Sequence, residues 1–343
     1  MAKKIALCRV SDTEPLLSLV RMLEYAGYEC VLPDRGLRDY LRSIGCGNVD
    51  EFSDMREKFG AEMPPARLHE FQKHCLAGID LLVDVNAFRN GPLVWKDYPQ
   101  LKDKTLCYFI NGGPPRSTED KGNGIDPPCP VITTNQWYRT DTYQEIKGSV
   151  KEIVELGHTA PWRDKSYVFY PSFERWDRVL PRRMDPEAAP VCFCHNVMGW
   201  GYGEFVEGAR NLGVKFYGFG SSPDGMMPHE ITFEFLAKTP CVVYLKGGGA
   251  VDYAVLEAMA AGVPVLFPVR YMRDTRTEEL MGLCGALDDR YLLQEIETAV
   301  SLYRDPVRNA HLGAWAQQRV RDLCWNEGRD GPEFAEWMGR MFR

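Results

Sequence analysis

The length, composition and charge of the chain exclude several classes of protein. Of its 343 residues, 45% are hydrophobic and 26% charged, a balance typical of a globular protein with two domains. The net charge of −7 disfavours a dedicated, strongly basic nucleic-acid binder, but it allows an enzyme with a local basic cleft. No apolar run reaches the roughly 18 residues of a membrane span. With no signal peptide at the start and 11 scattered cysteines, we expect a cytoplasmic protein.

The N-terminal part of the chain alternates apolar runs with helical patterns. IALCRV is followed by the helical pattern LLSLVRMLEYAG, which Gly27 ends, and then by a second strand, YECVLP. GIDLLVDVNA, KTLCYFING and PVITT are apolar runs closed by turn residues, a pattern typical of buried parallel strands. We expect helical structure between residues 37 and 77, and a further helix after Thr140.

The C-terminal part repeats this alternation after a proline-rich stretch. Residues 158–190 contain five prolines and several aromatic residues, and we interpret them as the connection between domains. PVCFCH, VKFYGFG, CVVYLK and PVLFP predict strands, with helices over 202–212, 230–238 and the stretch between the last two strands. The tail, from about residue 306, is predicted to be helical. Two such series predict two doubly wound, Rossmann-like domains facing a central cleft.

Residues 247–268, GGGAVDYAVLEAMAAGVPVLFP, predict an alanine-rich helix that carries one glutamate, Glu257. The three glycines allow a tight turn into the helix, whose N-terminus favours an anion. At about 100° per residue, Val255, Leu256 and Met259 share the face expected to pack on the sheet, and Glu257 lies opposite among methyl groups. The pattern fits either a helix surface that a ligand approaches closely or a helix that is packed on both sides, with Glu257 at a solvent-exposed edge.

This stretch resembles the donor site of GT-B glycosyltransferases, in which LEAMA and G-x-P-V form a helix and the next strand. The resemblance implies the GT-B fold, and it assigns to Glu257 a pair of charge-assisted hydrogen bonds to the ribose hydroxyls of a nucleotide sugar. Many retaining members carry a second glutamate eight residues earlier, where this chain has Gly249. Selection of the sugar is then left to Asp252 or to backbone amides.

The remaining donor-site residues also follow from this resemblance. Bacteriophage DNA glucosyltransferases place a basic pair after the first strand of this domain, but no Lys or Arg occurs between residues 191 and 209. Glycine amides, with His195, would hold the diphosphate, helped by cations from Lys246, Arg270 and Arg273. The loop before residues 230–238 would hold the base. The alternatives are a solvated surface for the two arginines and a helix-start role for His229. The expected donor site comprises Glu257 with His195, Gly199, Gly218, His229, Ile231, Lys246, Gly248, Gly249, Ala250, Val251, Asp252, Arg270 and Arg273.

The catalytic base is expected in the N-terminal domain. The strands of this domain resemble those of the same bacteriophage enzymes in their order and in their general residue pattern. Where those inverting enzymes carry an aspartate base, this chain has Asn111, and an amide cannot accept the proton of an acceptor hydroxyl. Either another acid serves, with Asp84 and Asp12 as candidates at strand ends, or the reaction is retaining and the departing phosphate assists. Asp84 is equally compatible with a structural hydrogen-bond acceptor.

The acceptor site is expected to use aromatic and arginine side chains. Trp137 and Arg139 follow the third apolar run, and Arg175 and Trp176 lie in the connection between domains. Aromatic rings stack on sugars and bases alike, and arginines suit phosphates, so both a saccharide and DNA with a flipped-out hydroxymethylated base are candidates. Alternatively, Trp176 and its neighbours pack the hinge.

These observations predict a GT-B enzyme with an acceptor-side domain over residues 1–165 and a nucleotide-sugar domain over 166–325. A final helix over 326–343 is expected to cross back to the first domain. The expected reaction transfers a sugar from a nucleoside-diphosphate sugar, with UDP favoured, to a hydroxyl of bacteriophage DNA, a saccharide or a small molecule. A sugar-nucleotide epimerase and a non-catalytic sugar-nucleotide-binding module are the alternatives. The sequence contains neither a DxD pair nor an NAD fingerprint, so we expect no metal and no cofactor.

Overall fold

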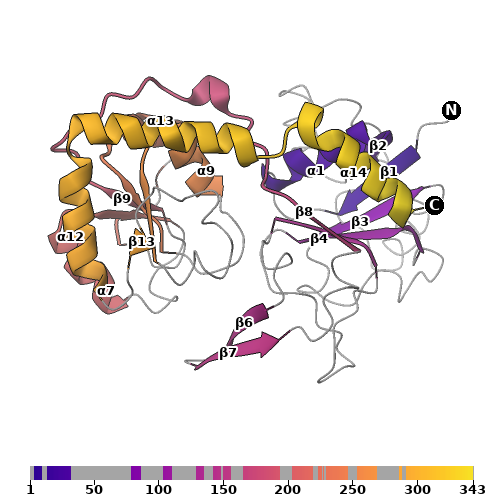
Figure 1. Ribbon diagram of the computed structural model, residues 1–343, viewed down its shortest axis with the longest axis horizontal. Coiled ribbons are helices and arrows are strands. Elements are labelled where there is room, and N and C mark those ends of the chain that lie inside the picture. The colour runs from indigo at the N-terminus through magenta and orange to yellow at the C-terminus, as the bar shows by residue number, and fades with distance from the viewer. Residues whose placement is uncertain are drawn as a thin grey trace, which may run out of the picture.

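The computed structural model forms two parallel β-sheets, one in each half of the chain (Figure 1). It describes residues 4–9, 14–31, 79–85, 103–109, 129–134, 142–147, 150–155, 165–193, 203–218, 223–225, 227, 229–245, 253–268, 286–287 and 291–342. The helical stretch expected between residues 37 and 77 lies outside these residues. Within them, no helix is both long and apolar enough to cross a membrane.

The first sheet has six parallel strands in the order β2-β1-β3-β4-β5-β8. Helix α1 (Glu14–Tyr25) joins the first two strands, and Gly27 follows it at φ +87°. Strand β8 pairs with β5, so the sheet extends past residue 165, the end that we expected for the first domain. Its strands are β1 (Lys4–Arg9), β2 (Tyr28–Val31), β3 (Leu81–Val85), β4 (Thr105–Phe109), β5 (Val131–Thr133) and β8 (Ser166–Val168).

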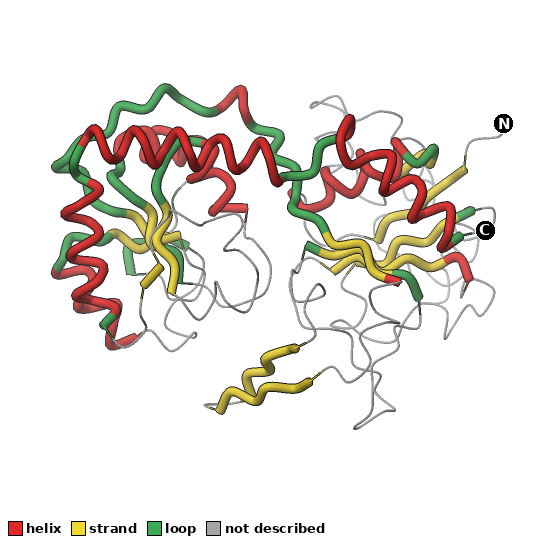
Figure 2. Tube along the Cα trace, in the orientation of Figure 1, coloured by secondary structure: helices red, strands yellow, loops and turns green. Residues whose placement is uncertain are grey.

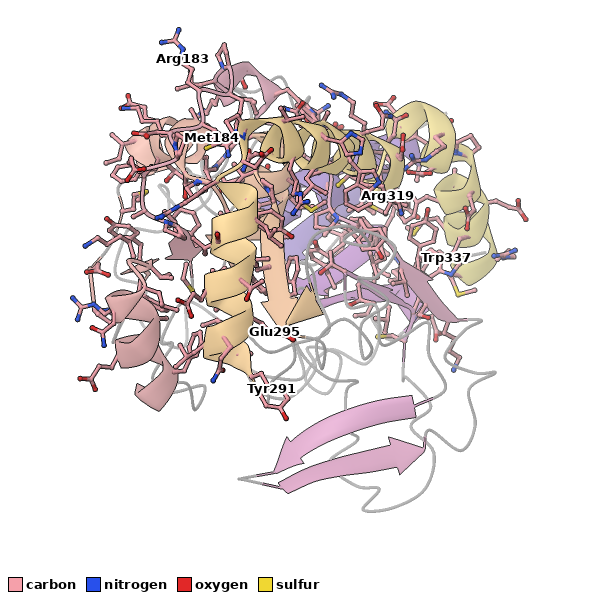
Figure 3. The ribbon with its side chains drawn as sticks, turned by 60° about the vertical axis from the view of Figure 1, so that its left-hand side comes forward. Arg183, Met184, Tyr291, Glu295, Arg319 and Trp337 are labelled. Carbon is pink, nitrogen blue, oxygen red and sulfur yellow. The ribbon has the colours of Figure 1, made fainter. Side chains whose placement is uncertain are left out.

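The last helix of the chain, α14 (Glu327–Met341), packs against α1 and completes the core of the first half. Trp337 of α14, labelled in Figure 3, is buried with its ring centroid 5.7 Å from that of Tyr167 in β8. Phe334 is fully buried in the same cluster. Figure 1 shows the reason: the chain leaves the second half at the end of α13 (Pro306–Leu323) and returns to the first.

The second sheet has five parallel strands in the order β10-β9-β11-β12-β13 and is covered on both faces (Figure 2). Successive residues of β12 alternate between the two cores: Val265 and Phe267 pack with α8, α9 and α13, whereas Leu266 packs with α7 and α12. The strands are β9 (Val191–Phe193), β10 (Lys215–Tyr217), β11 (Val242–Val243), β12 (Val265–Pro268) and β13 (Ala286–Leu287). The other helices are α7 (Gly203–Asn211), α8 (His229–Lys238), α9 (Tyr253–Ala260) and α12 (Leu292–Tyr303).

The two crossings between the halves run beside each other. Tyr170, just after β8, forms a parallel bridge with Cys324, just after α13. The carbonyl of Tyr170 also accepts a hydrogen bond from the backbone N–H of Trp325, at 2.9 Å. The halves are therefore joined by two hydrogen-bonded segments rather than by one loose linker.

The prediction of a helix after Thr140 is wrong, because this stretch is an antiparallel hairpin of β6 (Thr142–Lys147) and β7 (Val150–Glu155). Lys147 pairs with Val150, which leaves Gly-Ser as the two connecting residues. Gly-Ser between runs that contain Thr, Tyr, Ile and Val is a hairpin signal, and it outweighs the helical spacing of the charged residues.

The C-terminal end of α9 is closed by a glycine and by α13. Gly262 has φ +71°, and the N–H groups of Gly262 and Val263 donate to the carbonyls of Met259 and Ala258, at 3.0 and 2.9 Å, as in a Schellman motif. Gln317 of α13 donates to the Ala260 carbonyl at 2.8 Å. A Cβ placed on Gly313 of α13 would collide with the Gly262 carbonyl oxygen.

This close approach predicts that Gly313→Ala destabilises the protein. The added methyl meets backbone that cannot rotate away, so we expect a loss of about 1–3 kcal/mol and a lower urea midpoint. Gly339→Ala in α14 is the matched control, because nothing lies within 4 Å of the added methyl. It should stabilise by up to about 1 kcal/mol through helix propensity alone. Equal midpoints for the two variants would contradict the packing argument.

Candidate functional site

Each sheet has a topological switch point, at which the order of its strands reverses. In the first sheet the chain order reverses between β1 and β3, and in the second between β9 and β11. Ligands of open parallel sheets bind outside the carboxyl ends of the strands at such points. Helix α9 follows β11, so its N-terminal end lies at the carboxyl edge of the second sheet.

Helix α9 is buried from Val255 to Ala260, and this burial includes the carboxylate of Glu257. Glu257 is only 6% exposed, and its Oε1 accepts a hydrogen bond from a guanidinium nitrogen of Arg175, at 2.8 Å. Arg175 is itself only 7% exposed. A buried carboxylate needs such a counter-charge, because removing it from water costs several kcal/mol, on the order of what a close ion pair returns.

Arg175 belongs to residues 172–176, which we call the strap, between the two halves. Glu174, which precedes Arg175, donates its backbone N–H to the Tyr253 hydroxyl at 3.4 Å. The Arg175 guanidinium carbon lies 5.4 Å from the Tyr253 ring centroid. Burial raises the pKa of the Tyr253 hydroxyl, which keeps this group neutral beside the ion pair. Tyr253 and Glu257 are four residues apart on α9, so one face of the helix receives the strap.

The opposite side of the strap binds the first half of the chain. The Ser172 N–H donates to the Ser18 hydroxyl at 2.8 Å, and the two buried hydroxyls lie 2.7 Å apart. Glu174 forms an ion pair with Arg21 at 3.0 Å. Ser18 and Arg21 are one turn apart on α1. The side chains of residues 172 and 174 therefore meet α1, whereas those of residues 173 and 175 meet α9.

Trp176, a sequence-predicted acceptor residue, lies in the packing of the hinge. Its ring meets that of Phe173 edge-on, with centroids 5.0 Å apart, and the Arg321 guanidinium of α13 lies over it at 4.3 Å. Further along the linker, Arg182 donates to the Leu236 carbonyl of α8 at 2.7 Å, and burial lowers the pKa of its guanidinium to about 10.

Known proteins match this architecture in structure but not in sequence. No protein-family model and no curated protein matches the chain. Sucrose-phosphate synthase from Thermosynechococcus elongatus aligns with a TM-score of 0.52 at 16% identity, over 99% of this chain and 98% of that one. The catalytic domain of starch synthase IV from Arabidopsis thaliana aligns at 0.52 and 12% identity, over 99% of both chains. A glycosyltransferase from Rickettsia africae aligns at 0.51 and 11% identity, over 100% of this chain and 98% of that one. The chain has the GT-B fold.

Several predicted donor residues of this GT-B chain can be located. Gly218 follows β10 and donates its N–H to the Gly225 carbonyl at 2.9 Å. His229 is the first residue of α8, and Ile231 lies in its first turn with 36% exposure. Because α8 follows β10, its N-terminus lies at the same sheet edge as that of α9. The other donor candidates lie outside the described residues: His195, Gly199, Lys246, Gly248, Gly249, Ala250, Val251, Asp252, Arg270 and Arg273.

The predicted catalytic residues lie within or shortly after adjacent strands of the first GT-B sheet. Asp84 is in β3, where it pairs in register with Arg9 of β1 and Cys107 of β4. Asp12 follows β1 and Asn111 follows β4 in the sequence, and both lie outside the described residues, as do the acceptor candidates Trp137 and Arg139. Among the residues the structure covers, no group of three or more His, Cys, Asp or Glu could hold a metal ion.

The sequence pattern assigned Arg175 to the acceptor side and did not indicate its pairing with Glu257. In the structure, the Arg175 guanidinium points to α9. Tyr253, which flanks both the strap and the ion pair, also went unnoticed, although its spacing of four residues from Glu257 places both on one helix face.

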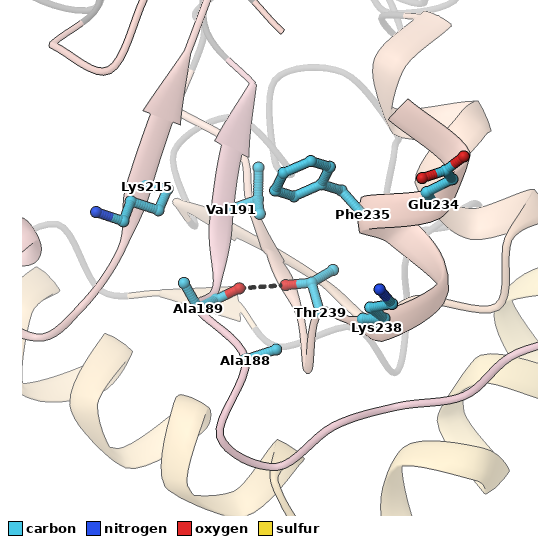
Figure 4. Close-up of a pocket in the computed structure, with 8 residues that line it drawn as sticks. All are labelled: Ala188, Ala189, Val191, Lys215, Glu234, Phe235, Lys238 and Thr239. Atoms are coloured by element: carbon cyan, nitrogen blue, oxygen red, sulfur yellow. Dashed lines mark hydrogen bonds between the residues drawn. The ribbon is translucent and has the colours of Figure 1, made fainter. Parts of the chain in front are cut away.

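A pocket of about 180 Å³ lies at the opposite edge of the second GT-B sheet (Figure 4). It sits at the N-terminal ends of β9 and β10, beside the end of α8, where the Thr239 hydroxyl donates to the Ala189 carbonyl at 2.7 Å. The pocket lies at the opposite end of the strands from their carboxyl edge, so it is separate from the candidate donor site. It is lined by Ala188, Ala189, Val191, Lys215, Glu234, Phe235, Lys238 and Thr239.

The buried ion pair predicts strongly non-additive mutations. Arg175→Met leaves the Glu257 carboxylate buried beside an apolar group, and we expect a loss of about 3–5 kcal/mol in the free energy of unfolding. Adding Glu257→Met removes the stranded charge, so the double variant should be more stable than Arg175→Met alone.

Urea denaturation of the wild type, both single variants and the double variant measures this coupling. Arg340→Met is the control, because its ion pair with Glu336 is exposed and should contribute at most about 0.5 kcal/mol. Losses that simply add would show that Arg175 and Glu257 do not depend on each other.

Proposed function

We propose that this chain is a glycosyltransferase that uses a nucleoside-diphosphate sugar as donor. The observation that carries the proposal is the position of α9: the helix with the LEAMA pattern begins at the carboxyl edge of the second sheet of a GT-B fold. In this proposal Glu257 accepts hydrogen bonds from the ribose hydroxyls. A carboxylate suits that role because its hydrogen bonds to hydroxyl groups are charge-assisted.

The proposed donor site stabilises the leaving group by electrostatics. As the glycosidic bond breaks, negative charge grows on the nucleoside diphosphate, and the N-terminal end of α9 offers partial positive charge in its direction. Residues 247–252 precede α9 in the sequence, and their glycines allow backbone N–H groups to approach the phosphates. Starch synthase IV, one of the structural matches, was solved with ADP bound, which supports a nucleoside diphosphate as the ligand class.

For the finer specificity we propose a UDP-sugar as donor and a hydroxymethylated base in DNA as acceptor. The resemblance of the N-terminal strands to bacteriophage DNA glucosyltransferases supports this choice. Trp137 and Arg139, which follow β5 in the sequence, add support, because rings stack on a base and guanidinium groups bind phosphates. A saccharide acceptor uses the same side-chain chemistry, so the two acceptors are compared directly in the turnover experiment below.

Glu257→Gln tests the ribose assignment without removing the hydrogen bond to Arg175. The amide keeps the size of the side chain but loses its charge, so the affinity for UDP should fall about 5- to 10-fold. Isothermal titration calorimetry measures this change, and circular dichroism should show an unchanged fold. Glu257→Ala is less informative, because it would strand Arg175 in a buried site. An unchanged UDP affinity would remove Glu257 from the donor site.

A turnover panel tests the reaction itself. The pure protein is incubated with UDP-, GDP-, ADP- and TDP-sugars, and release of nucleoside diphosphate is followed with no acceptor, with an oligosaccharide or with hydroxymethylated DNA. We expect release to depend on an acceptor. Binding without turnover for every combination would support a non-catalytic binding module, and an isomerised sugar would support an epimerase.

A further inference from the structure

The strap that joins the two halves also holds the proposed donor carboxylate. Its side chains alternate in direction: those of Ser172 and Glu174 contact α1, whereas those of Phe173 and Arg175 meet α9. Such alternation is the side-chain period of an extended backbone. The position of the Arg175 guanidinium is therefore set by contacts to both halves of the chain.

We propose that Arg175 is a positioning residue, which holds the Glu257 carboxylate in the orientation that receives the ribose hydroxyls. This inference rests on the proposed function and deepens it. It assigns to the linker between the domains a part in donor recognition that the sequence pattern of α9 does not contain.

The local geometry restricts both members of the pair. The guanidinium donates to Glu257 Oε1 at 2.8 Å and stands 5.4 Å from the Tyr253 ring, so it is held from two residues of one helix face. Tyr253 is fixed in turn by the Glu174 N–H and by the Phe173 ring, whose centroid lies 5.9 Å away. The planar guanidinium has a rigid geometry, so its hydrogen bond reaches Glu257 Oε1 from one fixed direction.

A fixed carboxylate binds a diol more tightly than a rotating one. A glutamate side chain loses rotamer freedom when it binds a ligand, and this loss lowers the affinity unless the side chain is already ordered. The ion pair imposes that order before the nucleotide arrives. It also balances the buried charge, so the carboxylate keeps its strength as a hydrogen-bond acceptor away from bulk water.

The preference for ribose over dideoxyribose measures this role. The nucleotide is UDP, ADP or GDP, whichever the wild type binds most tightly. Calorimetry compares the affinity for this nucleotide with the affinity for its 2′,3′-dideoxy counterpart. The variant is Arg175→Lys, which keeps the positive charge and the fold but loses the planar fork. Arg21→Met is the matched control, because it removes a strap contact on the α1 side and leaves the pair with Glu257 in place.

We expect the wild type and Arg21→Met to prefer the ribonucleotide about 10-fold, and Arg175→Lys to reduce this preference to about 3-fold or less. The affinity of Arg175→Lys for the dideoxynucleotide should match that of the wild type. A preference retained in Arg175→Lys would overturn the inference, and so would an equal loss for both nucleotides, which would indicate a contact to phosphate or a damaged fold. A wild type that binds no nucleotide would instead overturn the proposed function itself.

Discussion

The burial of one carboxylate constrains how the two halves of this protein are joined. Glu257 is 6% exposed in the middle of a buried helix, and a charge in that position requires an opposite charge within hydrogen-bond distance. Helix α9 does not supply that charge, and the strap does, through Arg175 at 2.8 Å. The linker must therefore pass along α9 on a fixed path. That path brings Ser172 and Glu174 to α1, so the strap contacts α1 and α9 at the same place.

The second crossing reinforces this path. The segment between α13 and α14 runs beside the linker, bridged at Tyr170 and Cys324, and α14 then buries Trp337 and Phe334 in the core of the first half. A chain that crosses twice at one place limits the relative motion of its halves to changes near that place. The strap lies at this same place, with its Arg175 directly beside Glu257.

The sequence predicted the parts of the fold that local patterns specify. Buried parallel strands appear as apolar runs, and Gly27 marked the end of α1 because the left-handed conformation there favours glycine. The hairpin over 142–155 was missed because its charged residues also fit a helical period, and only the Gly-Ser connection separates the two structures. The pairing of Arg175 with Glu257 joins residues 82 positions apart. No periodicity relates a linker residue to a helix face, so only tertiary packing can show that contact.

The contacts around α9 also decide from which direction a ligand can reach it. Gln317 and Gly313 of α13 close its C-terminal end, the strap covers the face of Tyr253 and Glu257, and its apolar residues pack on the second sheet. Approach to the helix is thereby directed toward its N-terminal end, at the carboxyl edge of β11. That end carries the positive side of the helix dipole and follows three glycines in the sequence. In the proposed donor complex, phosphates at this end would meet the favourable charge of the dipole, and the ribose would have to reach Glu257 past the strap, which covers that face of α9.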